Sequence, residues 1–182
     1  MGEIPENAHA RAHEQIKLAG EARAFRAAAS VAEPAKHWWN IGPAPVIGRL
    51  VYSGRVANIA ADPGNETHWL LATASGGVWE TRDAGLNWRP RTDDQPSLAM
   101  GAIAFAPGEP SIVYAGTGEA AFRADAFAGA GLLKSWDGGS TWQLIASTNF
   151  ARTAFSELRV DPADARTVIA ATTRGMAGRF SD

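Results

Sequence analysis

Cysteine is absent from the 182-residue chain, and tyrosine occurs only twice. The absence of cysteine excludes a disulfide framework and any thiolate metal site. Basic residues form no run and the formal net charge is −2, which argues against a nucleic-acid-binding surface. There is no long apolar run, so the sequence predicts no membrane span. His9 and His13 lie four residues apart without a third ligand, and we therefore predict no metal site and no cofactor.

Two eight-residue segments carry most of the information in this chain. Residues 81–88 and 135–142 both have the pattern Ser/Thr-x-Asp-x-Gly-x-Asn/Thr-Trp. An Asp side chain can accept hydrogen bonds from the backbone amides that follow it, and Gly can adopt a positive φ, so each segment predicts a tight turn between two strands. The Trp then supplies a large apolar surface at the start of the next strand. The residues expected to be structural are Asp83, Gly85 and Trp88 in the first turn and Asp137, Gly139 and Trp142 in the second.

The two turns belong to a longer repeat. Each copy begins with a β-like run that ends near a proline, at Pro63, Pro107 and Pro162, and a second β-like run follows it. The prolines are spaced by about 44 and about 55 residues, close to the period of roughly 40–50 residues found in four-stranded propeller blades. The sequence therefore predicts an all-β fold: a partial β-propeller of about two and a half four-stranded blades, at about 54–97, 98–150 and 155–182.

The repeat resembles the Asp-box, or BNR, propellers, a family that includes sialidases, sortilin-type receptors, xyloglucan-cleaving hydrolases and photosystem assembly factors. It is most similar to bacterial glycosyl-hydrolase-like members. The matching pieces are Gly54-Arg55-Val56, Asp62-Pro63, Gly76-Gly77-Val78-Trp79 and the two Asp turns. The resemblance covers about residues 38–178. It implies the fold and an extracellular or periplasmic location, but the Asp-box accompanies many unrelated functions.

Residues 1–37 differ from the rest and are predicted to form an N-terminal helical extension. They are rich in Ala, Glu, Arg and Lys, with apolar residues at helical spacing. They contain neither a basic n-region nor an apolar core, so we predict no signal peptide here. The incomplete propeller is assigned to residues 38–182. Because an open propeller exposes strand edges, we expect an N-terminal part of a larger protein; the alternatives are a truncated gene or closure by self-association.

The resemblance places a ligand on the propeller face opposite the Asp turns. On that face the second blade has a loop, residues 116–130, about ten residues longer than its counterpart in the first blade. Long loops on a rigid scaffold often carry function; here the alternative is a loop that merely packs across the blade top. The candidate ligand-face residues are Asp94, Glu119, Arg123, Asp125 and Arg174.

The sequence does not identify catalytic residues. In the xyloglucan-cleaving enzymes that the repeat resembles, a catalytic Asp stands where this chain has Ala74. The sialidases that it resembles carry an Arg-Ile-Pro motif, which this chain lacks. We therefore expect a propeller scaffold that presents loops to a glycan or protein ligand. One alternative is a glycoside hydrolase whose acid and base lie partly in further blades. Another is an assembly-factor or receptor-type propeller that binds a protein. Any enzymatic activity is expected to be glycoside hydrolysis.

Overall fold

The computed structural model describes residues 46–47, 51–52, 54–120 and 126–174. The chain divides into two compact units, Met1–Ser53 and Gly54–Asp182. In the first unit, strand β1 (Val46–Ile47) pairs antiparallel with β2 (Val51–Tyr52). The predicted N-terminal helix and the predicted boundary at residue 38 lie outside the described residues.

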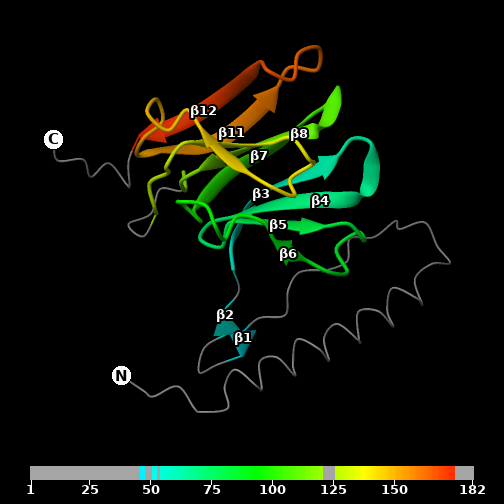
Figure 1. Cartoon of the computed structure of the whole chain (residues 1–182). Helices are drawn as coiled ribbons and strands as arrows, with labels where there is room; N and C mark the ends of the chain where they lie inside the picture. Colours follow the sequence, from blue (N-terminus) through cyan, green and yellow to red (C-terminus); the bar gives the residue numbers. More distant parts are fainter. Residues whose placement is uncertain (1–45, 48–50, 53, 121–125, 175–182) are drawn as a thin grey trace. The chain divides into compact units, whose positions relative to one another are not determined.

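The described residues of the second unit form two four-stranded sheets and one two-stranded sheet, all antiparallel (Figure 1). Within each sheet, the strands are arranged in the order in which they occur along the chain, so neighbouring strands are also consecutive in sequence. The first sheet is β3 (Val56–Asp62), β4 (Asn65–Thr73), β5 (Val78–Thr81) and β6 (Arg89–Pro90). The second is β7 (Met100–Ala106), β8 (Glu109–Thr117), β9 (Leu132–Ser135) and β10 (Gln143–Ile145). The third is β11 (Thr153–Val160) and β12 (Val168–Arg174).

The first strands of the three sheets lie next to one another, β3 beside β7 and β7 beside β11. Successive four-stranded meanders arranged in this way are the blades of a propeller. The all-β prediction is confirmed, and the described residues contain no helix. Both Asp turns connect the third and fourth strands of their blades, β5 to β6 and β9 to β10.

Two apolar clusters hold the blades together. The first lies between sheets one and two and includes Leu70, Val78, Ile103 and Leu133, all buried. The second lies between sheets two and three and is centred on the fully buried Phe155. Because side chains alternate along a strand, the second sheet contributes one of its faces to each cluster. Burial between sheets is therefore the main stabilising term in this unit.

One close approach fixes the distance between sheets two and three. A Cβ atom at Gly116 would lie 2.3 Å from both Cβ and Cγ of Phe155. The glycine in β8 thus makes room for the phenyl ring of β11, and any side chain at this position would push the two sheets apart.

Candidate functional site

The loops at one end of the blades are hydrogen-bonded to one another. Gly77 N, in the loop between β4 and β5, donates to Leu98 O in the segment between β6 and β7, at 2.8 Å. Gly118 N, just after β8, donates to Ala99 O in the same segment, at 2.7 Å. The described residues of these loops, 74–77, 91–99, 118–120 and 126–131, form what we call the loop face.

The Asp turns lie at the other end. Gly138 N in the second Asp turn donates to Ser111 O, which follows the β7–β8 turn, at 2.8 Å. Ala84 N makes the equivalent bond to Thr67 O in the first blade, at 3.0 Å. Both Asp turns are therefore packed against the turns between first and second strands, away from the loop face.

A cavity of about 280 Å³ opens where the first strands of the three sheets meet the loop face. Its lining comes from the start of β3, from β7, from β11 and from the residues after β8. The lining residues are Arg55, Val56, Ala57, Gly101, Glu119, Ala120 and Ser156. In a propeller the first strands surround the central axis, so this cavity lies at the axial end of the loop face.

Glu119 is the acidic group of this cavity and is 5% exposed. An isolated bridge between Glu119 and Phe155 holds its backbone beside β11, and Glu119 N donates to Phe127 O at 2.9 Å. Its Oε1 is ion-paired with the guanidinium of Arg55, which is two-fifths exposed. The cavity thus presents one buried carboxylate and one accessible guanidinium side by side.

Such a pair offers hydrogen-bond acceptors and donors to the same ligand. Neighbouring hydroxyls of a sugar can donate to the carboxylate and accept from the guanidinium. Hydrolysis of a glycosidic bond requires two carboxyl groups, about 5–10 Å apart. Glu119 is the one carboxylate among the cavity's described lining residues, so this set suits binding better than hydrolysis.

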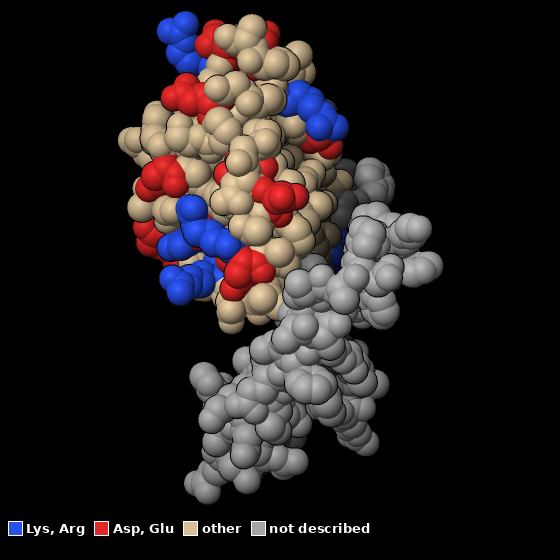
Figure 2. All heavy atoms as spheres, turned by 90° about the vertical axis from the view of Figure 1, so that its right-hand side faces the viewer, with Lys and Arg blue, Asp and Glu red and all other residues tan. Residues whose placement is uncertain are grey.

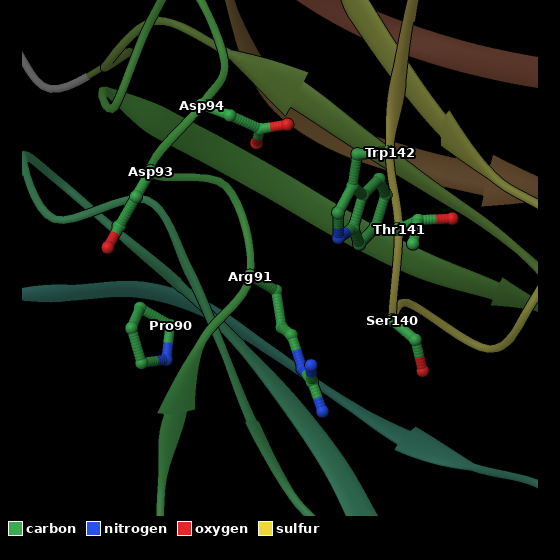
Figure 3. A pocket seen from close by; sticks show the side chains of 7 residues that line it. All are labelled: Pro90, Arg91, Asp93, Asp94, Ser140, Thr141 and Trp142. Atoms are coloured by element: carbon green, nitrogen blue, oxygen red, sulfur yellow. The ribbon is translucent and has the colours of Figure 1, made fainter.

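A second cavity, of about 310 Å³, lies between the first two blades (Figure 3). Pro90, Arg91, Asp93 and Asp94 form one wall, and Ser140, Thr141 and Trp142 form the other. In Figure 3 the Asp94 side chain points toward Trp142, whereas Asp93 points away.

The walls of this second cavity are tied together. Gln95 Nε2 donates to Asp94 Oδ1 at 3.1 Å and to Trp142 O at 3.3 Å.

On the face shown in Figure 2, acidic and basic side chains are interspersed and form no stripe of one sign.

The structure separates the predicted ligand-face residues. Glu119 and Asp94 line different cavities. Arg123 and Asp125 lie outside the described residues. Arg174 is the last residue of β12, paired with Thr153, and its side chain is not described. In the part of the chain that the structure describes, no group of acidic or histidine side chains is arranged to hold a metal ion.

The two Asp turns have matching hydrogen bonds. Asp83 Oδ1 accepts from Thr81 Oγ1 and from Asn87 N, both at 2.8 Å. Asp137 Oδ1 accepts from Ser135 Oγ at 2.7 Å and from Thr141 N at 2.8 Å.

The same hydrogen bonds favour the ionised form of the Asp83 and Asp137 carboxyls. Burial raises the pKa of both Asp carboxyls, but the hydrogen bonds that they accept outweigh it and hold each pKa below its ordinary value. Both oxygens of each carboxylate accept hydrogen bonds from residues of the same turn.

A buried charged cluster in the first blade was missed by the sequence reasoning. Glu80 is 2% exposed and contacts three cationic or ring groups. Its Oε1 lies 3.0 Å from His68 Nε2 and 2.7 Å from Arg82 Nη2, and its Oε2 accepts from Arg91 Nε at 2.8 Å. His68 Nδ1 lies 2.8 Å from Asp62 Oδ2. These five residues lie on five different strands and turns, so no local sequence motif predicts the cluster.

Arginines control the charge of this cluster. Burial raises the pKa of Glu80, but the hydrogen bond from Arg91 and the positive charges of Arg82 and Arg91 outweigh it, so the pKa lies below its ordinary value. Arg82 Nη2 also donates to Ser140 Oγ of the second blade at 3.2 Å. The cluster therefore stabilises the fold and the contact between blades.

No protein-family model matches this chain, and no curated protein sequence matches it. Its fold is similar to that of solved GH74 enzymes. An ancestral GH74 enzyme aligns with a TM-score of 0.54 and 21% identity over 76% of this chain and 15% of its own. The GH74 xyloglucanase from Xanthomonas campestris aligns with a TM-score of 0.47 and 23% identity, over 70% of this chain and 22% of its own. The chain thus spans less than a quarter of the length of either enzyme.

The first of these similarities supports the propeller fold and leaves the activity open. Glycoside hydrolases of this kind are propeller enzymes, so the resemblance to glycoside-hydrolase-like propellers holds at the level of the fold. In the described part of the chain, no helix has the length and hydrophobicity needed to cross a bilayer.

Proposed function

We propose that the loop face of this glycoside-hydrolase-like propeller binds a glycan, with Glu119 and Arg55 as the polar centre of the site. The observation that carries this proposal is the buried Glu119 carboxylate, ion-paired with Arg55 inside the axial cavity. Burying a carboxylate costs free energy that a surface position would avoid.

The surroundings of the pair also suit a sugar. Val56, Ala57 and Ala120 supply small apolar surface, and Ser156 supplies a hydroxyl. Sugar rings present both apolar C–H faces and hydroxyl edges, and ligand sites commonly combine an apolar lining with a few oriented polar groups. The similarity in fold to an ancestral GH74 enzyme makes a glycan the first ligand class to test.

Glycoside hydrolysis is the second candidate function. It is favoured by the position of Glu119, whose carboxyl group lies in the cavity where a bound sugar would contact it. It requires a second carboxylate across the bound sugar, and the described lining supplies none. Catalysis by this chain would thus depend on residues beyond the described part of the site.

The proposal is tested by titrating xyloglucan oligosaccharides into the protein in a calorimeter. Glu119→Gln retains the shape of the side chain and removes the charge that a sugar hydroxyl would contact. A hydrogen bond to a charged group contributes about 1.5–3 kcal/mol, so we expect binding to weaken by about 10-fold to 100-fold. Glu109→Gln, at the opposite end of β8, is the matched control and should bind like the native chain.

Three other outcomes would change the conclusion. Failure of the native chain to bind xyloglucan, cellulose and mannan oligosaccharides would reject the glycan-binding function. Unchanged binding in Glu119→Gln with loss in Asp94→Asn would move the site to the cavity between the blades. Release of new reducing ends by the native chain, abolished by Glu119→Gln, would establish hydrolysis.

A further inference from the structure

The loops that join the second and third strands of the two blades begin and end alike. In the first blade the loop between β4 and β5 starts after Thr73 and ends at Gly77. In the second blade the loop between β8 and β9, which we call the long loop, starts after Thr117 and ends at Gly131. Both terminal glycines have a positive φ, of 72° and 139°. The additional residues of the long loop therefore lie between two ends that match those of the short loop.

A threonine hydroxyl closes each of these loops. In the first blade, Thr73 Oγ1 donates to Gly77 O at 2.8 Å. In the second blade, Thr117 Oγ1 donates to Gly131 O at 2.5 Å and accepts from the backbone N of Gly131 at 2.9 Å and of Ala130 at 2.8 Å. A hydroxyl has one donor and two acceptor positions, so all three are used at Thr117. We call the Thr117 hydroxyl with these three hydrogen bonds the Thr117 clamp.

The Thr117 clamp lies at the base of the segment that carries Glu119. Glu119 is two residues beyond Thr117, and its N donates to Phe127 O, on the returning side of the long loop, at 2.9 Å. The clamp ties the same two sides together one step closer to the strands. Fixing the ends of a loop removes conformations that the residues between them could otherwise adopt. The clamp thus restricts the backbone of Glu119.

Only one of the two loops places a side chain in the axial cavity. The described lining of that cavity includes Glu119 and Ala120 from the long loop and no residue of the short loop. The Glu119 carboxylate is nearly fully buried there, beside Arg55. Because a carboxylate is better solvated in water than in such a position, the backbone has to hold Glu119 in place. The Thr73 hydroxyl of the first blade carries out the same closure without serving this site.

We propose that Thr117 is a positioning residue for the glycan site: its hydroxyl holds the long loop so that the Glu119 carboxylate stays in the axial cavity. This inference rests on the proposed glycan-binding function. The Thr117 side chain is fully buried, so it acts through Glu119 and does not itself contact the sugar. A protein whose binding-competent conformation is only partly populated has an apparent affinity reduced by that fraction. Loss of the clamp therefore weakens binding by lowering the population of loops with Glu119 in place.

The first measurement needs no ligand and uses two matched substitutions. Thr117→Val and Thr73→Val each remove one hydroxyl and retain a branched side chain. In amide hydrogen exchange followed by mass spectrometry, Thr117→Val should speed exchange in peptides that contain Glu119 and Gly131 by about 10-fold, because the loop opens more often without its buried hydrogen bonds. Thr73→Val should speed exchange at residues 74–77 and leave the Glu119 peptide like that of the native chain.

The second measurement is calorimetric titration with xyloglucan oligosaccharides, at a temperature at which circular dichroism shows that each variant is folded. Thr117→Val should bind about 10-fold more weakly than the native chain, as expected if about a tenth of the loops remain in place. Thr73→Val should bind like the native chain, although it loses the equivalent hydrogen bond. Thr117→Ser retains the hydroxyl and should restore both the affinity and the slow exchange.

A further variant covers a failure of Thr117→Val to fold. The added valine methyl would lie against the amides of Ala130 and Gly131, which Thr117 Oγ1 contacts at less than 3 Å. Thr117→Ala removes the hydroxyl and leaves space in which water can accept these hydrogen bonds. Its exchange and its affinity should change in the same direction as those of Thr117→Val.

The results separate this proposal from the glycan-binding function. Unchanged exchange of the Glu119 peptide in folded Thr117→Val or Thr117→Ala would refute the positioning role, whatever the affinity. Equal loss of affinity in Thr117→Val and Thr73→Val would also refute it, because it would show a general effect on the propeller unit. If the native chain binds no oligosaccharide, the glycan-binding function fails, and the exchange measurement alone then decides whether Thr117 holds Glu119 in place.

Discussion

Replacing Glu80 by Ala should destabilise the propeller unit by about 2–3 kcal/mol. Breaking a buried ion pair typically costs 3–5 kcal/mol because the remaining charge is left without a partner. Here the remaining charges belong to Arg82, which is half exposed, and Arg91, which is a quarter exposed. Both can recover part of their solvation from water, which lowers the expected cost. His68 stays buried and loses its contact with Oε1.

The assay is urea unfolding, followed by tryptophan fluorescence and by circular dichroism. The two probes should give one transition, which permits linear extrapolation to water. The expected loss corresponds to a fall of about 6–12 °C in Tm.

Glu66→Ala, an exposed substitution on the same sheet, is the control and should stay within about 0.5 kcal/mol of the native value. A loss below about 0.5 kcal/mol for Glu80→Ala as well would refute the reasoning, because it would mean that the charges compensate one another without Glu80.

Asp83→Ala should lower stability by about 1–3 kcal/mol, because the donors of the first Asp turn lose their acceptor; thermal unfolding measures this. Ala84 has a φ of 56° where the second turn has Gly138, so Ala84→Gly should raise stability by up to about 1 kcal/mol in the same assay. Gly116→Ala should cost about 1–3 kcal/mol through overpacking against Phe155, measured by urea unfolding. Because the Asp-turn carboxyls and the carboxyl of the buried cluster have lowered pKa values, their contribution to stability is present above about pH 4 and is lost as pH falls through the folded pKa values. A pH series of urea unfolding curves should show this acid loss.

Controls exist within the chain for these substitutions. Gly54→Ala meets no atom within 4 Å and should be close to neutral, in contrast to Gly116→Ala. A stability loss on Ala84→Gly would show that the entropy of the unfolded chain outweighs the strain of the turn. If Asp83→Ala abolished glycan binding without lowering the melting temperature, the structural account of the turn would be wrong. A flat pH profile between pH 6 and pH 2 would contradict the role of the three carboxylates.

The sequence by itself determined the elements of this protein. The Asp turns and the repeated prolines are local signals, since each depends on side chains within a few residues of the backbone groups that they contact. They were sufficient to predict strand, turn and strand in each blade, and the all-β propeller class follows from their repetition. The choice of Glu119 as a candidate ligand residue also came from local information, because it lies in the expanded loop.

Only the tertiary structure decided which side chains from distant parts of the sequence contact one another. Glu80 and His68 are separated along the chain by a turn and belong to different strands, and only sheet pairing brings them together with Asp62. Arg55 pairs with Glu119 because the first strands of three sheets converge, which no local pattern encodes. Pairing and burial depend on residues distant in sequence, so the cavity and the buried cluster could be found only in the folded chain.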